Sequence, residues 1–421
     1  MSLRKLGSLV SLLILLCAGM VFSAGKQVTI TWWHLDTQDD YKAEWQKMAD
    51  DFMAQHPNVK IEITVLENEA FKQKIATVMQ SGNPPDLFRS WGGGVMNEYA
   101  KAGLLRDITK DVVGTKWGKT IGKGSMAVYS YKGKYYGAPY DMGAVGIWYN
   151  KAIFKKLGIK PFKTWSELIA GVKKIKAAGI IPIAVGEGDK WPGHFWWVYL
   201  AVRLGGKEAF DKAYTRKGSF ADAPFVKAGE KLKELIELEP FQPGFLSAGY
   251  NDEASLVGNG KAAMELMGQW APYVQNSNTP DGKGLGKDLG WMPFPMVEGG
   301  AGKPTDVMGG GNGYILGKNA PDEAVEFLKH IVSYKYNARL AEQGRITPVV
   351  KGAEKALKDP NALQIAKAVS QADYYQLYYD QYLPPAVGEV VKDAVQALFA
   401  GTKTPKEAAE MIDKSFVENM K

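Results

Sequence analysis

Aromatic residues stand beside glycines, carboxylates and amides at the ends of several strand-like segments of this 421-residue chain. In the stretch SWGGG, Trp91 precedes three glycines at positions 92–94, between an apolar run and a helical pattern. A glycine-rich turn at a helix N-terminus can cradle a phosphate, but no lysine or arginine follows in this loop. An indole face instead suits the apolar face of a pyranose, whose hydroxyls bond to carboxylates, amides and imidazoles. The turn therefore favours a neutral sugar, stacked on Trp91 and approached by the glycine amides.

The same pairing of aromatic and polar residues recurs beyond other predicted strands. Ligands of parallel α/β sheets bind at the carboxyl ends of the strands, so these residues are expected to gather around one site. They are, in chain order, Trp32, Trp33, His34, Asp36, Glu67, Asn68, Tyr140, Asp141, Trp191, His194, Trp196, Trp197 and Trp270. Because Trp32 and Trp33 alternate on one strand, we expect one to face the core and the other the cleft. At least one of Trp196 and Trp197 is expected in the core, and the structural tryptophans are expected to be Trp148, Trp165 and Trp291.

Motifs of several enzyme classes do not occur. Residues 114–120, GTKWGKT, fall short of a phosphate-binding P-loop because position 113 is valine. The four histidines have no metal-ligand spacing, and no GxSxG motif is present, so we expect no metal, no cofactor and no catalytic residue. A glycosidase could still use two carboxylates distant in the sequence, which leaves an exported glycoside-processing enzyme as the alternative.

The N-terminus has the pattern of an export signal. Arg4 and Lys5 precede an apolar run over residues 6–21, and cleavage is expected after Ser23, which makes residues 1–23 a signal peptide. Cys17 is the only cysteine and could carry a lipid, but Leu16 stands where a small residue is expected, so anchoring is not favoured. We therefore expect a periplasmic or cell-surface protein without disulfides or thiolate metal sites.

The charge balance is mildly basic. Lysine and arginine number 52 against 45 acidic residues, a formal net charge of +7. The lysines are spread along helical patterns without a concentrated tract, which indicates solvated faces and argues against a nucleic-acid partner.

The order of predicted elements indicates an α/β protein with a mainly parallel sheet. A strand over residues 27–33, a helix closed by Pro57, a strand over 58–67, a helix over 71–82 and a short strand over 84–88 alternate. Thr164 and Glu167 form a capping-box pattern at the start of another helix. Residues 192–272 are predicted to be largely helical, strands return near 289–295 and 305–317, and a helix-rich tail begins at 322. Strands in three separated blocks predict two lobes joined by more than one crossing.

Several segments together resemble the extracellular solute-binding proteins of carbohydrate ABC transporters, the maltose- and oligosaccharide-binding group called family 1. The resemblance covers essentially the whole chain after the signal. The segments are TITWWH, SGNPPDLFRSWGGG, AKAGLLRDIT, GKYYGAPYDMGAVGIWYNKAIFKKLGI, KTWSELIAGVKKIKAAGIIPIAVG, WPGHFWW, GNGKAAMELMGQWA and AEQGRITPVVKGA.

The resemblance implies a two-lobed periplasmic-binding-protein-like fold with three crossings and a ligand cleft between the lobes. The crossings are expected near residues 139–143, 309–311 and 344–349. The N-terminal lobe would comprise residues 24–140 plus 311–348, and the C-terminal lobe residues 141–310 plus 349–421. The implied ligand-binding residues are Trp33, His34, Asp36, Glu67, Trp91, Asp141, His194, Trp270, Gly310 and Arg345. Among them, Trp270 of the Gly-Gln-Trp motif is expected to stack on the ligand.

The implied function is that of a non-enzymatic receptor. It would bind a sugar by hinge closure and deliver it to the permease subunits of a membrane transporter, as a monomer. The abundance of tryptophan favours a neutral di- or oligosaccharide, and a plant polysaccharide is its expected source. A receptor for phosphorylated ligands or for polyamines is a weaker alternative. Arg345 would have to bind the phosphate, and the carboxylates of the cleft would have to bind the polyamine.

Overall fold

The fold is described from a computed structural model, which describes residues 27–420. The predicted signal peptide and Cys17 lie outside the described residues. Within residues 27–420, no helix is both long enough and apolar enough to cross a membrane.

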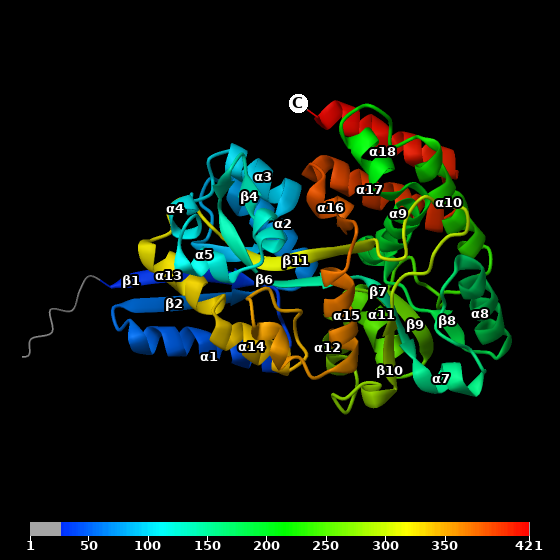
Figure 1. Cartoon of the computed structure of the whole chain (residues 1–421), viewed down its shortest axis with the longest axis horizontal. Coiled ribbons are helices and arrows are strands. Elements are labelled where there is room, and N and C mark those ends of the chain that lie inside the picture. Colours follow the sequence, from blue (N-terminus) through cyan, green and yellow to red (C-terminus); the bar gives the residue numbers. More distant parts are fainter. Residues whose placement is uncertain (1–26, 421) are drawn as a thin grey trace, which may run out of the picture.

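The first lobe is built on a six-stranded sheet with the order β12-β11-β3-β1-β2, to which β6 adds by pairing with β11. Figure 1 shows this sheet between helices, on the left of the molecule. The strands are β1 (Val28–His34), β2 (Val59–Val65), β3 (Leu87–Ser90), β6 (Gly137–Ala144), β11 (Val307–Leu316) and β12 (Tyr375–Leu377). Strand β1 is parallel to β2 and β3, as predicted, whereas β11 is antiparallel to β3. Strand β3 begins later than predicted because Pro84 and Pro85 cannot donate backbone hydrogen bonds.

Helices cover both faces of this sheet. They are α1 (Asp39–Gln55), α2 (Asn68–Gln80), α3 (Gly93–Lys101), α4 (Thr109–Val112), α5 (Lys116–Thr120), α6 (Lys123–Ala127), α13 (Asp322–Ile331) and α14 (Tyr334–Glu342), with a small hairpin of β4 (Ser130–Tyr131) and β5 (Lys134–Tyr135). Trp32 lies at the centre of one core cluster, against Trp45 and Phe327. Trp33 points to the other face, where it packs half-buried against the core cluster that contains Phe71. Because both faces are covered, neither residue faces the cleft, contrary to the expectation for this pair.

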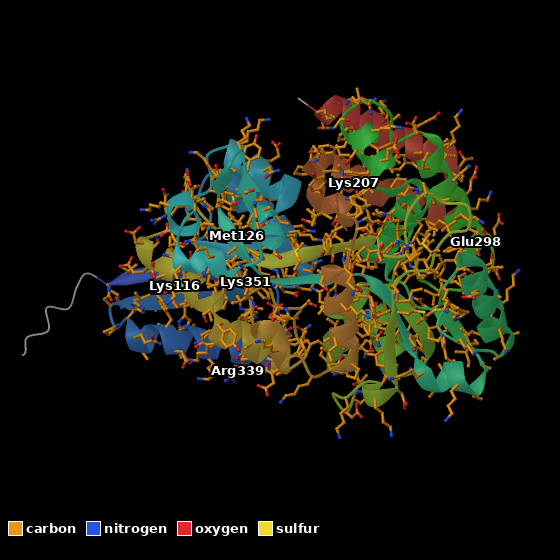
Figure 2. All side chains as sticks on the ribbon, viewed as in Figure 1. Lys116, Met126, Lys207, Glu298, Arg339 and Lys351 are labelled. Carbon is orange, nitrogen blue, oxygen red and sulfur yellow. The ribbon has the colours of Figure 1, made fainter. Side chains whose placement is uncertain are left out.

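The second lobe has a four-stranded sheet of order β10-β7-β9-β8. Its strands are β7 (Gly146–Asn150), β8 (Ile181–Ile183), β9 (Ala262–Met267) and β10 (Leu289–Met292). Its helices are α7 (Lys151–Lys156), α8 (Trp165–Ala177), α9 (Trp191–Tyr214), α10 (Ala223–Ile236), α11 (Tyr250–Gly258), α12 (Ala271–Ser277), α15 (Pro360–Ser370), α16 (Tyr379–Tyr382), α17 (Pro385–Phe399) and α18 (Pro405–Asn419), with short 3-10 turns at η1 (Glu187–Asp189) and η2 (Gly286–Asp288). A third 3-10 turn, η3 (Ala353–Ala356), packs on the first lobe. The predicted capping box of Thr164 and Glu167 starts α8. Side chains fill the space between the layers of both lobes (Figure 2).

The predicted structural tryptophans belong to the core of this lobe. Trp148, Trp165 and Trp291 are buried, as are both Trp196 and Trp197. The long helix α9 carries the last two and is apolar on nearly all sides, because α10 and α17 pack against it.

The three segments predicted as crossings lie side by side. Strand β6 pairs antiparallel with β11, so that Gly143 lies opposite Gly310. The amide of Met142 donates to the carbonyl of Thr347 at 3.0 Å, which adds the third segment. Beyond the predicted lobe boundary at residue 348, Val349 and Ala353 still pack in the core of the first lobe, because the η3 turn lies on α14.

Candidate functional site

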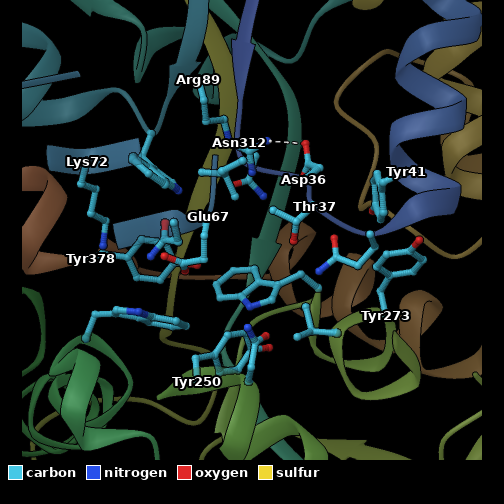
Figure 3. A pocket seen from close by; sticks show the side chains of 18 of the residues that line it. Asp36, Thr37, Tyr41, Glu67, Lys72, Arg89, Tyr250, Tyr273, Asn312 and Tyr378 are labelled. Atoms are coloured by element: carbon cyan, nitrogen blue, oxygen red, sulfur yellow. Dashed lines mark hydrogen bonds and ion pairs between the residues drawn. The ribbon is translucent and has the colours of Figure 1, made fainter. Parts of the chain in front are cut away.

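A cavity lies between the two lobes, and the empty space in it and in its solvent-filled opening amounts to about 960 Å³. Its aromatic lining comes from both lobes and consists of Tyr41, Trp91, Trp191, Phe195, Tyr250, Trp270, Tyr273 and Tyr378. Its polar lining consists of Asp36, Thr37, Gln38, Glu67, Asn68, Lys72, Arg89, Asn251, Asn312, Asp380 and Gln381. Figure 3 shows indole and phenol rings facing carboxylate and amide groups across this space. The cavity thus offers flat apolar faces together with groups that bond to hydroxyls.

Four of the ten predicted site residues line the cavity. They are Asp36, Glu67, Trp91 and Trp270. The other six, Trp33, His34, Asp141, His194, Gly310 and Arg345, do not line it. The sequence motifs identify segments that lie near the cavity. They do not show that the side chains of these six residues lie outside its lining.

His34 and Asp36 illustrate the difference between a lining residue and a supporting one. His34 is buried, and its Nδ1 accepts a hydrogen bond from the Asp36 amide at 3.3 Å. Burial lowers the pKa of His34 to about 4, against the opposing effect of Asp36, so the imidazole is neutral at neutral pH. It helps to hold the backbone at the point where Asp36 enters the cavity.

Asp36 is held by two donors through a single oxygen. Its Oδ2 accepts a hydrogen bond of 2.8 Å from Trp45 Nε1 and lies 3.5 Å from a guanidinium nitrogen of Arg89. Arg89 also donates to the hydroxyl of Tyr140. Burial would lower the pKa of Arg89, but Tyr140 and Asp36 raise it above its usual value. Asp36 therefore faces the cavity as a fixed, charge-compensated acceptor.

A second carboxylate, Asp380, is fixed from behind by His194. His194 Nε2 lies 3.4 Å from Asp380 Oδ1, and its Nδ1 contacts the carbonyl of Trp191. Burial acts to raise the pKa of Asp380, but His194 and the more distant Lys72 and Lys392 hold it well below its usual range. His194 thus supports an ionised carboxylate in the cavity wall, although it does not line the cavity itself.

Gly310 and Arg345 also act from outside the lining. A Cβ at Gly310 would lie 2.1 Å from Cε2 of Tyr378, so glycine lets this ring lie flat on β11. Arg345 pairs with Asp40 at 3.0 Å, and its guanidinium lies 4.7 Å from the ring centre of Tyr41 and 5.2 Å from that of Tyr273. Since Tyr41 belongs to the first lobe and Tyr273 to the second, this cluster joins the lobes at one edge of the cavity.

Asp141 lies buried among the crossings. Its carboxylate accepts hydrogen bonds from the side chains of Gln269 and Asn312 and from the amide of Thr347. Burial raises the pKa of Asp141 to about 6, against the opposing effect of these hydrogen bonds. Of these residues only Asn312 lines the cavity.

The aromatic walls are formed by segments of different lobes. In the second lobe, the ring centre of Trp191 lies 6.3 Å from that of Trp270 and 4.9 Å from that of Tyr250. In the first lobe, Trp91 follows β3, and the ammonium of Lys72 lies 5.7 Å from its ring and 6.0 Å from that of Trp191. The rings of Trp91 and Trp191 therefore approach the same group from opposite lobes.

The glycine of the Gly-Gln-Trp motif has a steric role. A Cβ at Gly268 would lie 2.1 Å from Cζ3 of Trp270, so only glycine lets the indole fold back over its own backbone. The glycines after Trp91 are needed for packing as well. A Cβ at Gly92 would lie 2.4 Å from the carbonyl oxygen of Val128. The amides of Gly92 and Gly93 already donate to Ser90 Oγ and to the Val128 carbonyl, so the expectation that these amides serve sugar hydroxyls is wrong for both.

Several buried polar atoms of the lining have no protein partner among the described residues. They are Trp191 Nε1 and the hydroxyls of Tyr250, Tyr273 and Tyr378. Buried polar groups are normally hydrogen-bonded, so a ligand or water is the partner left for these atoms. Sequence reasoning singled out Trp191 but not these tyrosines, Asn312 or Asp380. Asn312 alone had a local signal, since it lies in the GGGNG run of a crossing.

No metal site accompanies this lining in the described part of the chain. Across residues 27–420, no three or more His, Cys, Asp or Glu side chains are grouped so that they could hold a metal ion.

Comparison with known proteins places this architecture in a family. Residues 36–338 match the family described as bacterial extracellular solute-binding protein. The chain belongs to that family. This confirms the resemblance drawn from the sequence to the solute-binding proteins of carbohydrate ABC transporters, and the two-lobed fold expected from it.

Individual relatives of this solute-binding protein are moderately similar. The diacetylchitobiose binding protein DasA of Streptomyces coelicolor is 27% identical over 92% of this chain and 89% of the relative. An uncharacterized extracellular-binding protein of Pyrococcus horikoshii, PH1214, is 30% identical, but the match spans only 62% of this chain and 57% of that protein.

Two solved structures extend the comparison. One comes from a description of xylan utilization by Caldanaerobius polysaccharolyticus; it is 29% identical, with a TM-score of 0.85 over 92% of this chain and 99% of that chain. The other is a chitin oligosaccharide binding protein, 26% identical, with a TM-score of 0.85 over 94% of this chain and 99% of that chain.

Proposed function

We propose that this solute-binding protein is the extracytoplasmic receptor of a carbohydrate ABC importer. It binds an oligosaccharide in the cavity between the lobes and delivers it to permease subunits in the membrane, as a monomer that is released or lipid-tethered. The observation that carries this proposal is that aromatic faces from both lobes line the cavity together with polar groups. Among these polar groups, three tyrosine hydroxyls and one indole nitrogen have no hydrogen-bond partner among the described residues, and the carboxylate of Asp36 is held through only one of its two oxygens. Such a lining matches the alternating apolar faces and hydroxyl edges of a sugar chain.

The ligand is a neutral, linear, β-1,4-linked oligosaccharide. Two relatives above 25% identity are described as binding diacetylchitobiose and chitin oligosaccharides, and a third is described in connection with xylan, and all of these are β-1,4-linked chains. In the cavity, the cations Lys72 and Arg89 are matched by Glu69 and Asp36, at 2.8 and 3.5 Å. Neither cation is left to recognise a phosphate, which argues against a phosphorylated ligand.

Binding occurs without turnover. A glycosidase needs two carboxylates facing each other across the scissile bond, one of them an acid with a raised pKa. Glu67 lies in the cavity, where it caps helix α2 by accepting from the amide of Glu69 at 2.8 Å, but Asp141 is buried among the crossings. Asp380 does line the cavity, yet its pKa is lowered by its surroundings rather than raised. Asp380 therefore suits hydrogen-bond acceptance better than proton donation, and Asp141 does not line the cavity.

Closure of the lobes accompanies binding. The lobes proposed from the sequence meet at the three crossings, and the ligand would bridge Trp91 of one lobe and Trp270 of the other. A ligand shifts an open–closed equilibrium only through better contacts in the closed form, which a cavity lined by both lobes provides.

A thermal-unfolding screen tests the proposal. Xylo-oligosaccharides, chito-oligosaccharides, cello-oligosaccharides, maltose and monosaccharides are added to the purified protein, together with spermidine and a sugar phosphate. A ligand at a hundredfold excess over its dissociation constant stabilises the folded state by about 2.7 kcal/mol, which gives a clear rise in Tm. A rise with a β-1,4-linked oligosaccharide that is recovered intact supports the proposal. A response to spermidine or a sugar phosphate alone, or steady cleavage of an oligosaccharide, would contradict it.

A further inference from the structure

The segment from β7 to the end of α8 carries an unusual excess of positive charge. Residues 151–176 contain eight lysines and one acidic residue, Glu167. This excess equals the formal net charge of +7 of the entire chain, so the remaining residues, with Arg4 and Lys5 of the predicted signal peptide included, are neutral overall. The lysines that look scattered along the sequence are therefore concentrated in one part of the second lobe. They are Lys151, Lys155, Lys156, Lys160, Lys163, Lys173, Lys174 and Lys176, and all eight are exposed.

The fold brings the two halves of this segment together. Helix α7 and the turn after it carry Lys155, Lys156 and Lys160, whereas α8 carries Lys173 and Lys174 on the side away from its buried residues. The ammonium of Lys174 reaches the turn after α7, where it lies 3.9 Å from the position that a Cβ would occupy at Gly158. We call the exposed surface of residues 151–176 the lysine face.

Nearby carboxylates, among them Glu234, which accepts from Trp165 Nε1 at 3.0 Å, offset only part of the charge of the lysine face. Among the ion pairs of the described residues, only Lys176 has an acidic partner, Glu239 at 3.0 Å. Glu167 is engaged in capping α8, where its Oε2 accepts from the amides of residues 163 and 164. Glu298, on the same side of the molecule in Figure 2, accepts from the amide of Ser166 at 3.2 Å. Like charges at this density repel one another, so the lysine face lowers its free energy by meeting a negatively charged surface.

The lysine face is also separate from the ligand cavity. None of the cavity-lining residues belongs to α7 or α8. In Figure 1 these helices lie at the end of the second lobe that is farthest from the first lobe. Contact with another surface there leaves the cavity and the three crossings untouched.

We propose that the lysine face docks the protein reversibly on an anionic lipid surface. Clusters of four to eight basic residues bind anionic lipid headgroups, and each lysine near the surface strengthens binding about fivefold. The face lacks exposed large apolar side chains, which fits attraction to headgroups without insertion into the bilayer. Docking keeps the receptor close to the membrane in which its permease lies. The inference uses the proposed importer role only to choose a membrane as the partner surface.

Vesicle co-sedimentation tests the proposal. The full protein is mixed, without sugar, with vesicles of phosphatidylcholine alone or of phosphatidylcholine with phosphatidylglycerol, at about 0.01 M and about 1 M salt, where charges act over roughly 30 and 3 Å. The variant K155Q/K156Q/K173Q/K174Q removes four charges from the lysine face. The matched control K101Q/K116Q/K227Q/K318Q removes four exposed lysines from other surfaces, all without an ion-pair partner in the described structure.

We expect binding only to the anionic vesicles at low salt, and at least a tenfold weaker partition coefficient for the lysine-face variant. The control variant should bind within twofold of the unchanged protein, and Tm values should be similar for all three. No binding to anionic vesicles, or equal weakening in both variants, would overturn the proposal. The lysine face would then be an exposed surface that contacts only solvent. Association only with vesicles that contain the permease would overturn it in favour of a protein partner. Sugar affinity, measured separately on the same variants, decides the proposed receptor function independently.

Discussion

The side-chain amide of Asn312 donates a 2.7 Å hydrogen bond to the buried carboxylate of Asp141. This bond links the second crossing to the first, and the amide of Thr347 adds the third by donating to the other carboxylate oxygen at 2.8 Å. Gln269, which precedes Trp270, donates to the same carboxylate. Asn312 lines the cavity, so one network joins the proposed hinge, the ligand site and the loop that carries the main stacking residue.

Replacing Asp141 with asparagine should disturb this network without changing its size. An amide at this position presents hydrogen atoms to donors, which leaves at least one buried donor unsatisfied at a cost of about 1–3 kcal/mol. We expect a lower free energy of unfolding in urea and weaker sugar binding. Asp50→Asn, on the exposed side of α1, is the control and should change stability by less than about 0.5 kcal/mol. Equal stability of the two variants would show that the network does not hold the crossings.

Trp270 should be the dominant contact of the ligand. A tryptophan at the centre of an interface commonly accounts for about 2 kcal/mol or more, so Trp270→Ala is expected to weaken sugar binding about 30-fold or more by calorimetry. Trp91→Ala should also weaken binding, because this ring faces the cavity from the other lobe. Unchanged affinity in Trp91→Ala, with an unchanged Tm, would mean that Trp91 only fills space beside Phe71.

Much of the fold could be predicted because its signals are local. The alternation of VTITWWH and VKIEITV and the helical spacing between them depend only on neighbouring residues, and the observed β1, α1 and β2 follow these patterns. Strand β9 was missed because its sequence, AAMELM, consists of good helix formers. Its extended form is imposed by pairing with β7 and β8 on either side.

The candidate site could be predicted only in part, for a related reason. Trp91 and Trp270 stand next to glycines that fit no other residue, and this combination is visible in the sequence. Tyr378 reaches the cavity from the tail of the chain, and no local pattern reveals that β12 returns it to the first sheet. His194 is correctly placed near the site, but its sequence neighbours do not show that it faces Asp380 rather than the ligand.

Stability should fall as the pH rises through the range in which two buried glutamates lose their protons. Burial raises the pKa of Glu265 to about 7 from its ordinary 4.5, against hydrogen bonds with Gln275 and Glu253, and burial beside Glu265 raises the pKa of Glu253. Between pH 4.5 and 7 the folded protein keeps protons that the unfolded chain releases. Stability is therefore greatest at the acid end of this window and declines by an amount on the order of 1 kcal/mol per pH unit.

The variant Glu265→Gln isolates this effect. His34, whose pKa is lowered to about 4, acts in the opposite direction at acid pH, so the measured quantity is the difference in unfolding free energy between the unchanged protein and the variant. We expect the variant to gain stability relative to the unchanged protein as the pH rises from 4.5 to 7. Glu230→Gln, at an exposed site on α10, should show no such trend. A constant difference across the window would contradict the assignment.

His194 should control ligand binding through Asp380 rather than by touching the ligand. In the unchanged protein the pKa of Asp380 is held well below its usual range, so this carboxylate stays ionised and sugar affinity should not vary with it between pH 5 and 8. In His194→Gln the contact between the imidazole and Asp380 is lost while the side chain keeps a similar size, and the effect of burial then raises the pKa of Asp380. Sugar affinity of this variant should approach that of the unchanged protein at pH 8 and fall progressively as the pH is lowered.

Calorimetric titrations across this pH range measure the effect, and His56→Gln, outside the cavity, serves as the control. A pH-independent loss of affinity in His194→Gln would mean that His194 only packs against Phe195, since a lost packing contact weakens binding without introducing a titration.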